Sequence, residues 1–289
     1  MTVRSDALPR VSLAFLFVLL ADGTLAAQDP PVCHMIATGG TIAMKINPAK
    51  NAPVPALSGE DLLASVPELT KVARIRVENL FNIPSDYIDP ERWVSIQTAA
   101  VNALAKPEVV GVIISHGTDT LEETAYFLDL TVSSDKPIVL VGAAAQRIRA
   151  RFRRASQSAQ CQPHLRFTAG AGKGALIALN NQINAAREAT KTNTFDVETF
   201  RSGDFGFLGT IDQDWVVFAR SPLRRQHIAL KNARLPRVDI VPMYAGADGT
   251  LIRAPATAGA RGIVIEAAGS GNVNLEMYGA VCRSVSGVV

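Results

Sequence analysis

Four side chains in separate polar segments are of the types that carry out nucleophilic catalysis. Thr41 directly follows a Gly-Gly pair, Thr118 adjoins Asp119, and Lys191 lies between two threonines. A threonine hydroxyl is a weak nucleophile, so it needs a basic partner to remove its proton and N–H donors to hold the developing oxyanion. A lysine amine could be that partner, and a carboxylate could bind a substrate amine. These groups can act together only if the fold brings them to one place.

Each of these segments also has a purely structural interpretation. Thr118 and Asp119 precede a predicted helix, where such residues usually satisfy unpaired helix N–H groups. Most lysines are solvated surface charges, and Lys191 can be one of them. The turn that ends in Gly40 and Thr41 is equally typical of a capping threonine or of a nucleotide-phosphate loop. Taken singly, the segments leave both interpretations open.

The stretch at residues 109–130 predicts how Thr118 and Asp119 are positioned. Residues 109–114 form a nearly unbroken, β-branched apolar run, which is typical of a strand buried on both faces of a parallel sheet. Apolar residues then recur at helical spacing from Leu121, and Thr120 with Glu123 fits a capping box. The polar loop therefore lies at the carboxyl end of a strand and beside a helix N-terminus, where open α/β sheets bind ligands.

Strand-like and helical segments alternate along the first two thirds of the chain. Strands are predicted at residues 32–37, 75–80, 109–114, 137–142 and 174–179, with helices after Ser58, which pairs with Asp61, and over residues 90–104. This order predicts a doubly wound parallel sheet with right-handed crossovers, of the Rossmann or flavodoxin-like kind. Residues 44–59 lack either period and are predicted to be a long loop, of the kind that often forms a lid.

The two ends of the chain differ from this central part. Residues 1–27 have a basic start, a short apolar run and a small-residue cleavage site, and so predict a secretory signal peptide. The remainder divides into a catalytic α/β domain at residues 28–222, a linker at 223–236 and an incomplete, smaller α/β domain at 237–289. In a Gram-negative source the mature protein would be periplasmic, with no membrane attachment after cleavage.

Composition narrows the classes of function further. The 289 residues are 48% hydrophobic and 19% charged, which is typical of a globular chain. The net charge is +3, but residues 143–169 hold six arginines and no acidic residue, so the rest of the chain has more acidic than basic residues. The basic excess is confined to one segment, and the net charge therefore does not predict nucleic-acid binding. The chain has three cysteines, Cys33, Cys161 and Cys282, whose separations match no zinc-ligand spacing. No metal or other cofactor is predicted.

Three motifs occur together and in order: TGGTIA at residues 38–43, HGTDTLEETAYFLDLTV at 116–132 and TKTNT at 190–194. Through them the chain resembles the bacterial L-asparaginase/glutaminase family, in particular its secreted, periplasmic type. The resemblance covers roughly residues 32–142 and 172–281. It implies an amidohydrolase that converts L-asparagine, with L-glutamine as a second candidate, to the acid and ammonia without a cofactor.

The resemblance also implies roles for particular residues. Thr41 would be the nucleophile that forms an acyl-enzyme, and Thr118 would work with Lys191 in proton transfer. Asp119 would hold the α-amino group of the substrate, and Ser85 its α-carboxylate.

Further binding residues follow from the same resemblance. Gly40 and Asp86 would line the substrate site, and Asn274 would reach the site of a neighbouring subunit, since the family is usually a homotetramer with sites shared between chains.

Residues 143–171 and the C-terminus depart from the family pattern. The expected residue types are lost over 143–171 and return abruptly at Gly172, which suggests a stretch of the gene read in a shifted frame and then restored. The chain ends soon after residue 281, where the family continues. A second hypothesis is therefore a non-catalytic family member that only binds an amino acid.

Overall fold

The computed structural model describes residues 31–40, 44–47, 52–55, 58–64, 67, 73–142, 169–194, 196–212, 215–222, 226–231 and 233–285. The predicted signal peptide, Thr41 and most of the basic segment at 143–171 lie outside these ranges. By its backbone contacts the chain divides into Met1–Pro30 and a compact unit, Pro31–Val289. None of the helices in the described ranges is long and apolar enough to cross a bilayer.

An eight-stranded sheet in the order β12-β11-β8-β7-β6-β5-β1-β4 forms the main part of the fold. Five neighbouring strands are parallel, as predicted: β4 (Arg74–Ile83), β1 (Val32–Gly39), β5 (Val109–Ser115), β6 (Ile138–Val141) and β7 (Ala175–Leu179). Beyond β7 the sheet continues with antiparallel strands, which the sequence did not predict: β8 (Gln182–Ala185), β11 (Gly209–Asp212) and β12 (Trp215–Phe218).

The order in which strands are added to the sheet changes direction between β1 and β5. From β1 it passes to β4 at one edge, and it then returns to β5 on the other side of β1 before adding β6 and β7. This is a topological switch point, beside which the loops after neighbouring strands diverge and leave room for a ligand. Gly40, directly after β1, and the loops that follow β4 and β5 lie together at the carboxyl ends of these parallel strands.

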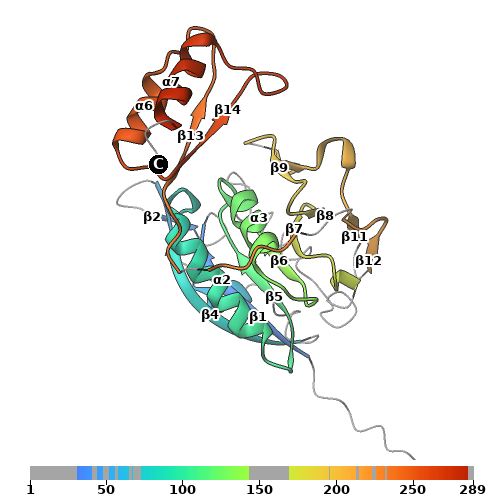
Figure 1. The fold of residues 1–289 in the computed structure, drawn as a ribbon. Helices are drawn as coiled ribbons and strands as arrows, with labels where there is room; N and C mark the ends of the chain where they lie inside the picture. Colours follow the sequence, from blue (N-terminus) through green and yellow to red (C-terminus); the bar gives the residue numbers. More distant parts are fainter. Residues whose placement is uncertain are drawn as a thin grey trace, which may run out of the picture. The chain divides into compact units, whose positions relative to one another are not determined.

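Apolar residues of β5 and of two helices build the core that holds these loops. Val112 and Ile114 are fully buried in β5, beneath α2 (Pro90–Leu104) and α3 (Leu121–Thr131). Both helices contribute to the same buried cluster, with Ile96 and Leu128 at 0% exposure. Figure 1 shows α2 and α3 alongside the parallel strands. Val109 is also fully buried, and Ile113 is partly buried on the opposite face, so both faces of the strand are covered, as predicted.

The two predicted helix caps have different outcomes. At α1 (Gly59–Ala64), the Ser58 hydroxyl accepts the Asp61 N–H and the Asp61 carboxylate accepts the Ser58 N–H, so this capping box forms. At α3 the N-cap is Thr120, as predicted, but its side chain makes no capping bond. Its hydroxyl donates instead to the Ser85 carbonyl oxygen at 2.6 Å. The backbone of Thr120, at φ −121° and ψ 19°, is not in the extended conformation that side-chain capping requires.

Residues 44–59 are not the structureless loop that the sequence predicted. They contain β2 (Met44–Asn47) and β3 (Ala52–Pro55), which pair antiparallel as a sheet of their own. Prolines at positions 53 and 55 argued against a strand, but a two-stranded ribbon has only edges, where the missing proline N–H is tolerated. The role of a lid stays a prediction.

The C-terminal residues form a second α/β unit, as predicted. β13 (Val238–Pro242) and β14 (Gly262–Glu266) are parallel, and α6 (Thr250–Thr257) connects them. With α7 (Leu275–Val285) they enclose a core of their own around Ile252 and Met277.

Candidate active site

Glycines bring three loops into contact at the switch point. Gly39 and Gly40, at the end of β1, have φ values of +99° and +82°. A Cβ on Gly40 would lie 2.2 Å from the backbone nitrogen of Gly117, and one on Gly117 would lie 2.5 Å from the Ser85 hydroxyl oxygen. Neither position has space for a side chain. The loops after β1, β5 and β4 therefore touch only because these residues are glycines.

The N–H of Gly40 is not available to a ligand. It donates to the carbonyl oxygen of Ile83 at 2.9 Å and so ties the turn to the end of β4. A Gly-Gly turn after a strand can present its backbone N–H groups to a ligand, but here that of Gly40 does not. The same bond removes a donor that a nucleotide-phosphate loop would use.

Ser85 connects the loop after β4 to the loop after β5. It opens η3 (Ser85–Tyr87), is 3% exposed, and its hydroxyl oxygen accepts the backbone N–H of Asp119 at 3.2 Å. A hydroxyl that accepts one hydrogen bond keeps its own hydrogen to donate to another acceptor. The next residue, Asp86, is exposed. Ser85 thus holds the Asp119 backbone and still has a hydroxyl hydrogen to donate.

The amine of Lys191 lies against both side chains of the Thr118-Asp119 pair. It donates to the Thr118 hydroxyl oxygen at 3.0 Å and to an Asp119 carboxylate oxygen at 2.6 Å. Thr118 is 5% exposed and the Lys191 side chain 17%, whereas the Asp119 side chain is 64% exposed. A proton can therefore pass directly between Thr118 and Lys191, while much of the Asp119 carboxylate stays open to a ligand.

His116 belongs to a buried chain of hydrogen bonds beneath this loop. Its Nδ1 lies 2.7 Å from the Gly117 carbonyl oxygen, which can only accept, so Nδ1 carries a hydrogen. Its Nε2 lies 3.0 Å from the Thr124 hydroxyl, and that hydroxyl accepts the Trp93 indole N–H at 3.0 Å. In a neutral ring Nε2 accepts, so Thr124 donates to it. His116 and Thr124 then each donate one hydrogen bond and accept another.

The environment of His116 favours this neutral form. The side chain is fully buried, and burial lowers the pKa of the imidazole, since a charged ring loses its hydration. The hydrogen bond with the Gly117 carbonyl partly offsets this by raising the pKa. The ring therefore fixes the orientation of the Gly117 carbonyl, next to Thr118, and carries no charge.

Two predicted site residues, Thr41 and Asn274, have no described contact with this cluster. Thr41 is outside the described ranges, although Gly40, which precedes it, packs on Gly117. In the C-terminal unit, the Asn274 amide donates to the Ala247 carbonyl at 2.6 Å and accepts the Met277 N–H at 2.9 Å. Asn274 thus caps the start of α7, and its predicted contact with a neighbouring subunit stays a prediction.

Sequence reasoning missed three residues that hold the cluster together. His116 and Thr124 form the buried chain beneath Gly117, and the carboxylate of Glu122 accepts the backbone N–H of Lys191. All three lie within the stretch 116–124. Their spacing of six or fewer residues from Thr118 was visible, but helical periodicity alone does not indicate which polar side chains turn inward.

Two protein-family models match this sequence. The model described as "Asparaginase, N-terminal" matches residues 33–224, and the one described as "Glutaminase/Asparaginase C-terminal domain" matches residues 237–289. Together the two matches account for most of the chain.

Proteins that match most of this chain are named as L-asparaginases. The chain is 38% identical over 263 residues to the probable periplasmic L-asparaginase of Haemophilus influenzae, covering 86% of this chain and 72% of the relative. It is 37% identical to L-asparaginase 2 of Bacillus subtilis, covering 86% and 68%. A crystal structure of a probable cytoplasmic L-asparaginase from Campylobacter jejuni superposes with a TM-score of 0.77 at 30% identity, covering 89% of this chain and 81% of that one.

Proposed function

This chain belongs to the asparaginase family, and on that premise we propose that it hydrolyses the side-chain amide of L-asparagine to L-aspartate and ammonia. It is an amidohydrolase of the L-asparaginase type. The single observation that carries the proposal is the contact of Lys191 with both Thr118 and Asp119, side chains more than 70 residues away in the sequence. These were the groups that the chemistry required to meet.

Thr41 is proposed as the nucleophile. It directly follows Gly40, so covalent geometry keeps its Cα within about 3.8 Å of a residue packed on Gly117. Its hydroxyl oxygen would attack the amide carbon and its proton would pass to the Thr118 oxygen, while Thr118 gives its own proton to the neutral amine of Lys191. The tetrahedral intermediate then expels ammonia after a proton returns to the nitrogen, which leaves an ester on Thr41.

Water completes the reaction. A water molecule that loses a proton to the same pair attacks the ester carbon, the bond to the Thr41 oxygen breaks, and the hydroxyl regains its proton. The products are L-aspartate and the free enzyme. The chain's own hydroxyl and amine groups account for each proton transfer in this scheme.

Substrate recognition is assigned to the groups beside the Thr118-Lys191 pair. The Asp119 carboxylate, largely exposed although paired with Lys191, would hold the α-ammonium group. The Ser85 hydroxyl accepts the Asp119 N–H, and its remaining hydrogen would donate to the α-carboxylate. Gly40 and Asp86 would border the same site, and Asn274 would approach it from a neighbouring subunit.

The biological setting is also part of the proposal. We expect residues 1–27 to direct export and the mature enzyme to act in the periplasm, a location that the name of the Haemophilus influenzae relative also states. We also propose domain boundaries at residues 222 and 237 and a homotetrameric assembly.

L-Glutamine is a second candidate substrate, in line with the description of the family model that matches residues 237–289. A protein that only binds an amino acid is not favoured, because the Thr118-Lys191 contact is in place and the relatives are named as enzymes.

A direct assay tests the function. Purified protein is supplied with L-asparagine or L-glutamine, and ammonia release is compared between the parent and Thr41→Ala. We expect turnover of L-asparagine by the parent and a loss of at least about a hundredfold in the variant. Equal, nonzero rates would remove Thr41 as the nucleophile, and no release by the parent with either amide would overturn the proposed activity.

A further inference from the structure

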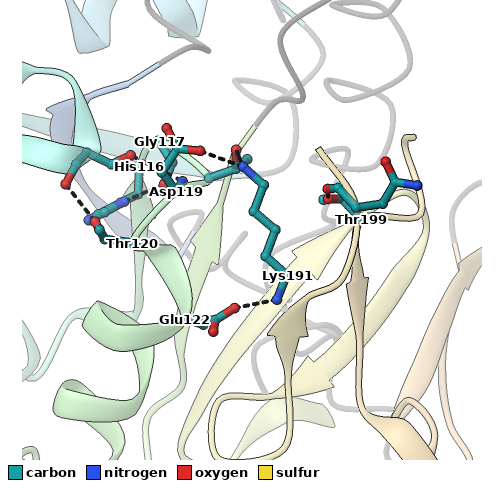
Figure 2. A network of polar contacts seen from close by, with 10 residues as sticks. His116, Gly117, Asp119, Thr120, Glu122, Lys191 and Thr199 are labelled. Atoms are coloured by element: carbon teal, nitrogen blue, oxygen red, sulfur yellow. Dashed lines mark hydrogen bonds and ion pairs between the residues drawn. The ribbon is translucent and has the colours of Figure 1, made fainter. Parts of the chain in front are cut away.

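The carboxylate of Glu122 connects the first turn of α3 to the strand that carries Lys191. One of its oxygens accepts the backbone N–H of Lys191, and the other accepts the hydroxyl of Thr190 at 2.9 Å. Figure 2 shows Glu122 at the backbone end of Lys191 and the loop of His116, Gly117 and Asp119 towards the amine end. Glu122 is not among the groups used in the proposed reaction.

Within the described residues, backbone pairing holds the strand that carries Lys191 only to its own hairpin, whose other strand is anchored by Phe200 in the main core. β9 (Thr190–Lys191) pairs only with β10 (Phe200–Arg201), and the two form a separate sheet that shares no ladder with the eight-stranded one within the described residues. Further hydrogen bonds, from Thr192 to Thr199, stay within the same hairpin. The place of β9 beside α3 therefore depends on side-chain contacts rather than on backbone pairing.

Glu122 and the Thr118-Asp119 pair contact Lys191 at opposite ends. Glu122 binds its backbone nitrogen, and Thr118 and Asp119 bind its amine. All three partners belong to one short stretch that ends in the first turn of α3, a rigid element built on the core. A lysine side chain with a fixed backbone end reaches a much smaller region than one on a loose strand.

We propose that Glu122 is a positioning residue for catalysis, which clamps β9 to α3 so that the Lys191 amine stays within reach of the Thr118 hydroxyl. This inference rests on the proposed function of the Thr118-Lys191 pair. Glu122 touches neither substrate nor the reacting atoms. It acts through the backbone of Lys191.

Two substitutions separate the geometry of the clamp from its charge. Glu122→Ala removes both contacts while keeping a residue that favours the helix. Glu122→Gln keeps the shape without the charge, because its amide oxygen can accept the Lys191 N–H and its amide N–H can donate to the Thr190 hydroxyl. Glu123→Ala is the matched control, since Glu123 lies in the same turn of α3 but is exposed to solvent.

The first measurement is steady-state ammonia release from L-asparagine by the parent and the three variants. We expect kcat to fall about 10- to 100-fold in Glu122→Ala, with KM changed less than about threefold, because misplacement of a proton carrier slows chemistry more than binding. Glu122→Gln should recover to within about threefold of the parent, and Glu123→Ala should match it. Parent-like kcat in Glu122→Ala, or a Gln variant as slow as the Ala variant, would overturn the inference.

The second measurement does not depend on activity. Amide hydrogen exchange of the peptide that spans β9 and β10 should speed up at least about tenfold in Glu122→Ala and remain unchanged in Glu123→Ala. Unchanged exchange in Glu122→Ala would refute the clamp even in an active enzyme. If the parent shows no turnover, the proposed function fails, while the exchange result still decides whether Glu122 positions Lys191.

Discussion

The amine of Lys191 lies 3.0 Å from the hydroxyl oxygen of Thr118, although 73 positions separate the two residues in the chain. The contact joins the two-residue strand β9 to the loop after β5, the middle one of the five parallel strands. The local sequence around each residue does not indicate a catalytic role. The two side chains can carry a proton only because they are in contact. Substitutions in this pair and in the loops that hold it should therefore have distinct effects.

Replacing Lys191 with methionine should abolish most of the activity. The change removes the amine but keeps the length and apolar stem of the side chain, so we expect kcat for L-asparagine to fall about 10²- to 10⁴-fold with the fold retained. Lys173→Met is the control, because Lys173 also donates a hydrogen bond, to Ser221 at 2.8 Å. Lys173 precedes β7 and so lies at the amino-terminal end of the parallel strands, away from the loops at their carboxyl ends. Similar losses in both variants would contradict the assignment.

An alanine at Gly40 should damage both stability and activity. Its Cβ would lie 2.2 Å from the Gly117 nitrogen, which is a backbone atom and cannot turn aside. We expect a loss of more than about 3 kcal/mol in the free energy of unfolding measured in urea. Gly172→Ala isolates the backbone strain, because Gly172 has φ +71° and a Cβ added there would meet no atom within 4 Å, so it should cost only about 1 kcal/mol. Equal losses would show that the contact with Gly117 is unimportant.

The buried His116 should make the protein less stable in acid. Its pKa is lowered by burial, so between that value and the ordinary value of about 6.5 the unfolded chain binds more protons than the folded one. Stability is therefore complete above about pH 6.5 and falls as the pH drops below it, by at most about 1.4 kcal/mol per pH unit.

A neutral replacement tests the source of this dependence. Unfolding free energies of the parent and His116→Gln are compared at about pH 7.5 and about pH 5, and the fall should be smaller in the variant by about 1 kcal/mol or more. His227→Gln, at an exposed histidine, should leave the fall unchanged. A parent and a His116 variant with the same pH dependence would mean that His116 is not the group responsible.

Removal of the Ser85 hydroxyl should weaken the binding of substrates that carry an α-carboxylate. For Ser85→Ala we expect KM for L-asparagine to rise about tenfold or more, because a hydrogen bond to a charged group is lost. The control is 3-aminopropanamide, which is asparagine without that carboxylate. The parent and the variant should turn over this compound with similar kcat/KM. A comparable loss on both compounds would indicate that Ser85 acts only by holding the Asp119 backbone.

Local patterns predicted the elements of the fold well and the irregular parts poorly. The apolar run at β5 and the helical period from Leu121 predicted this strand and α3. A strand buried on both faces has consecutive apolar residues, whereas a helix buried along one stripe has apolar residues every three or four positions. The ribbon of β2 and β3 was missed because such short, proline-containing strands show no alternation. The Thr120 capping bond was wrong because Thr120, at ψ 19°, lacks the extended backbone of an N-cap, and its hydroxyl is turned to a carbonyl of another loop.

Types of residue and their order along the chain were sufficient to predict an α/β fold, to select Thr118, Asp119 and Lys191, and to identify the family. The tertiary structure alone decided that these three side chains meet, that Glu122 and His116 support them, and that the Gly40 N–H is already used. The physical reason is range. Helix and strand preferences act between neighbours a few positions apart, whereas a hydrogen bond between distant segments depends on where the whole sheet places its loops.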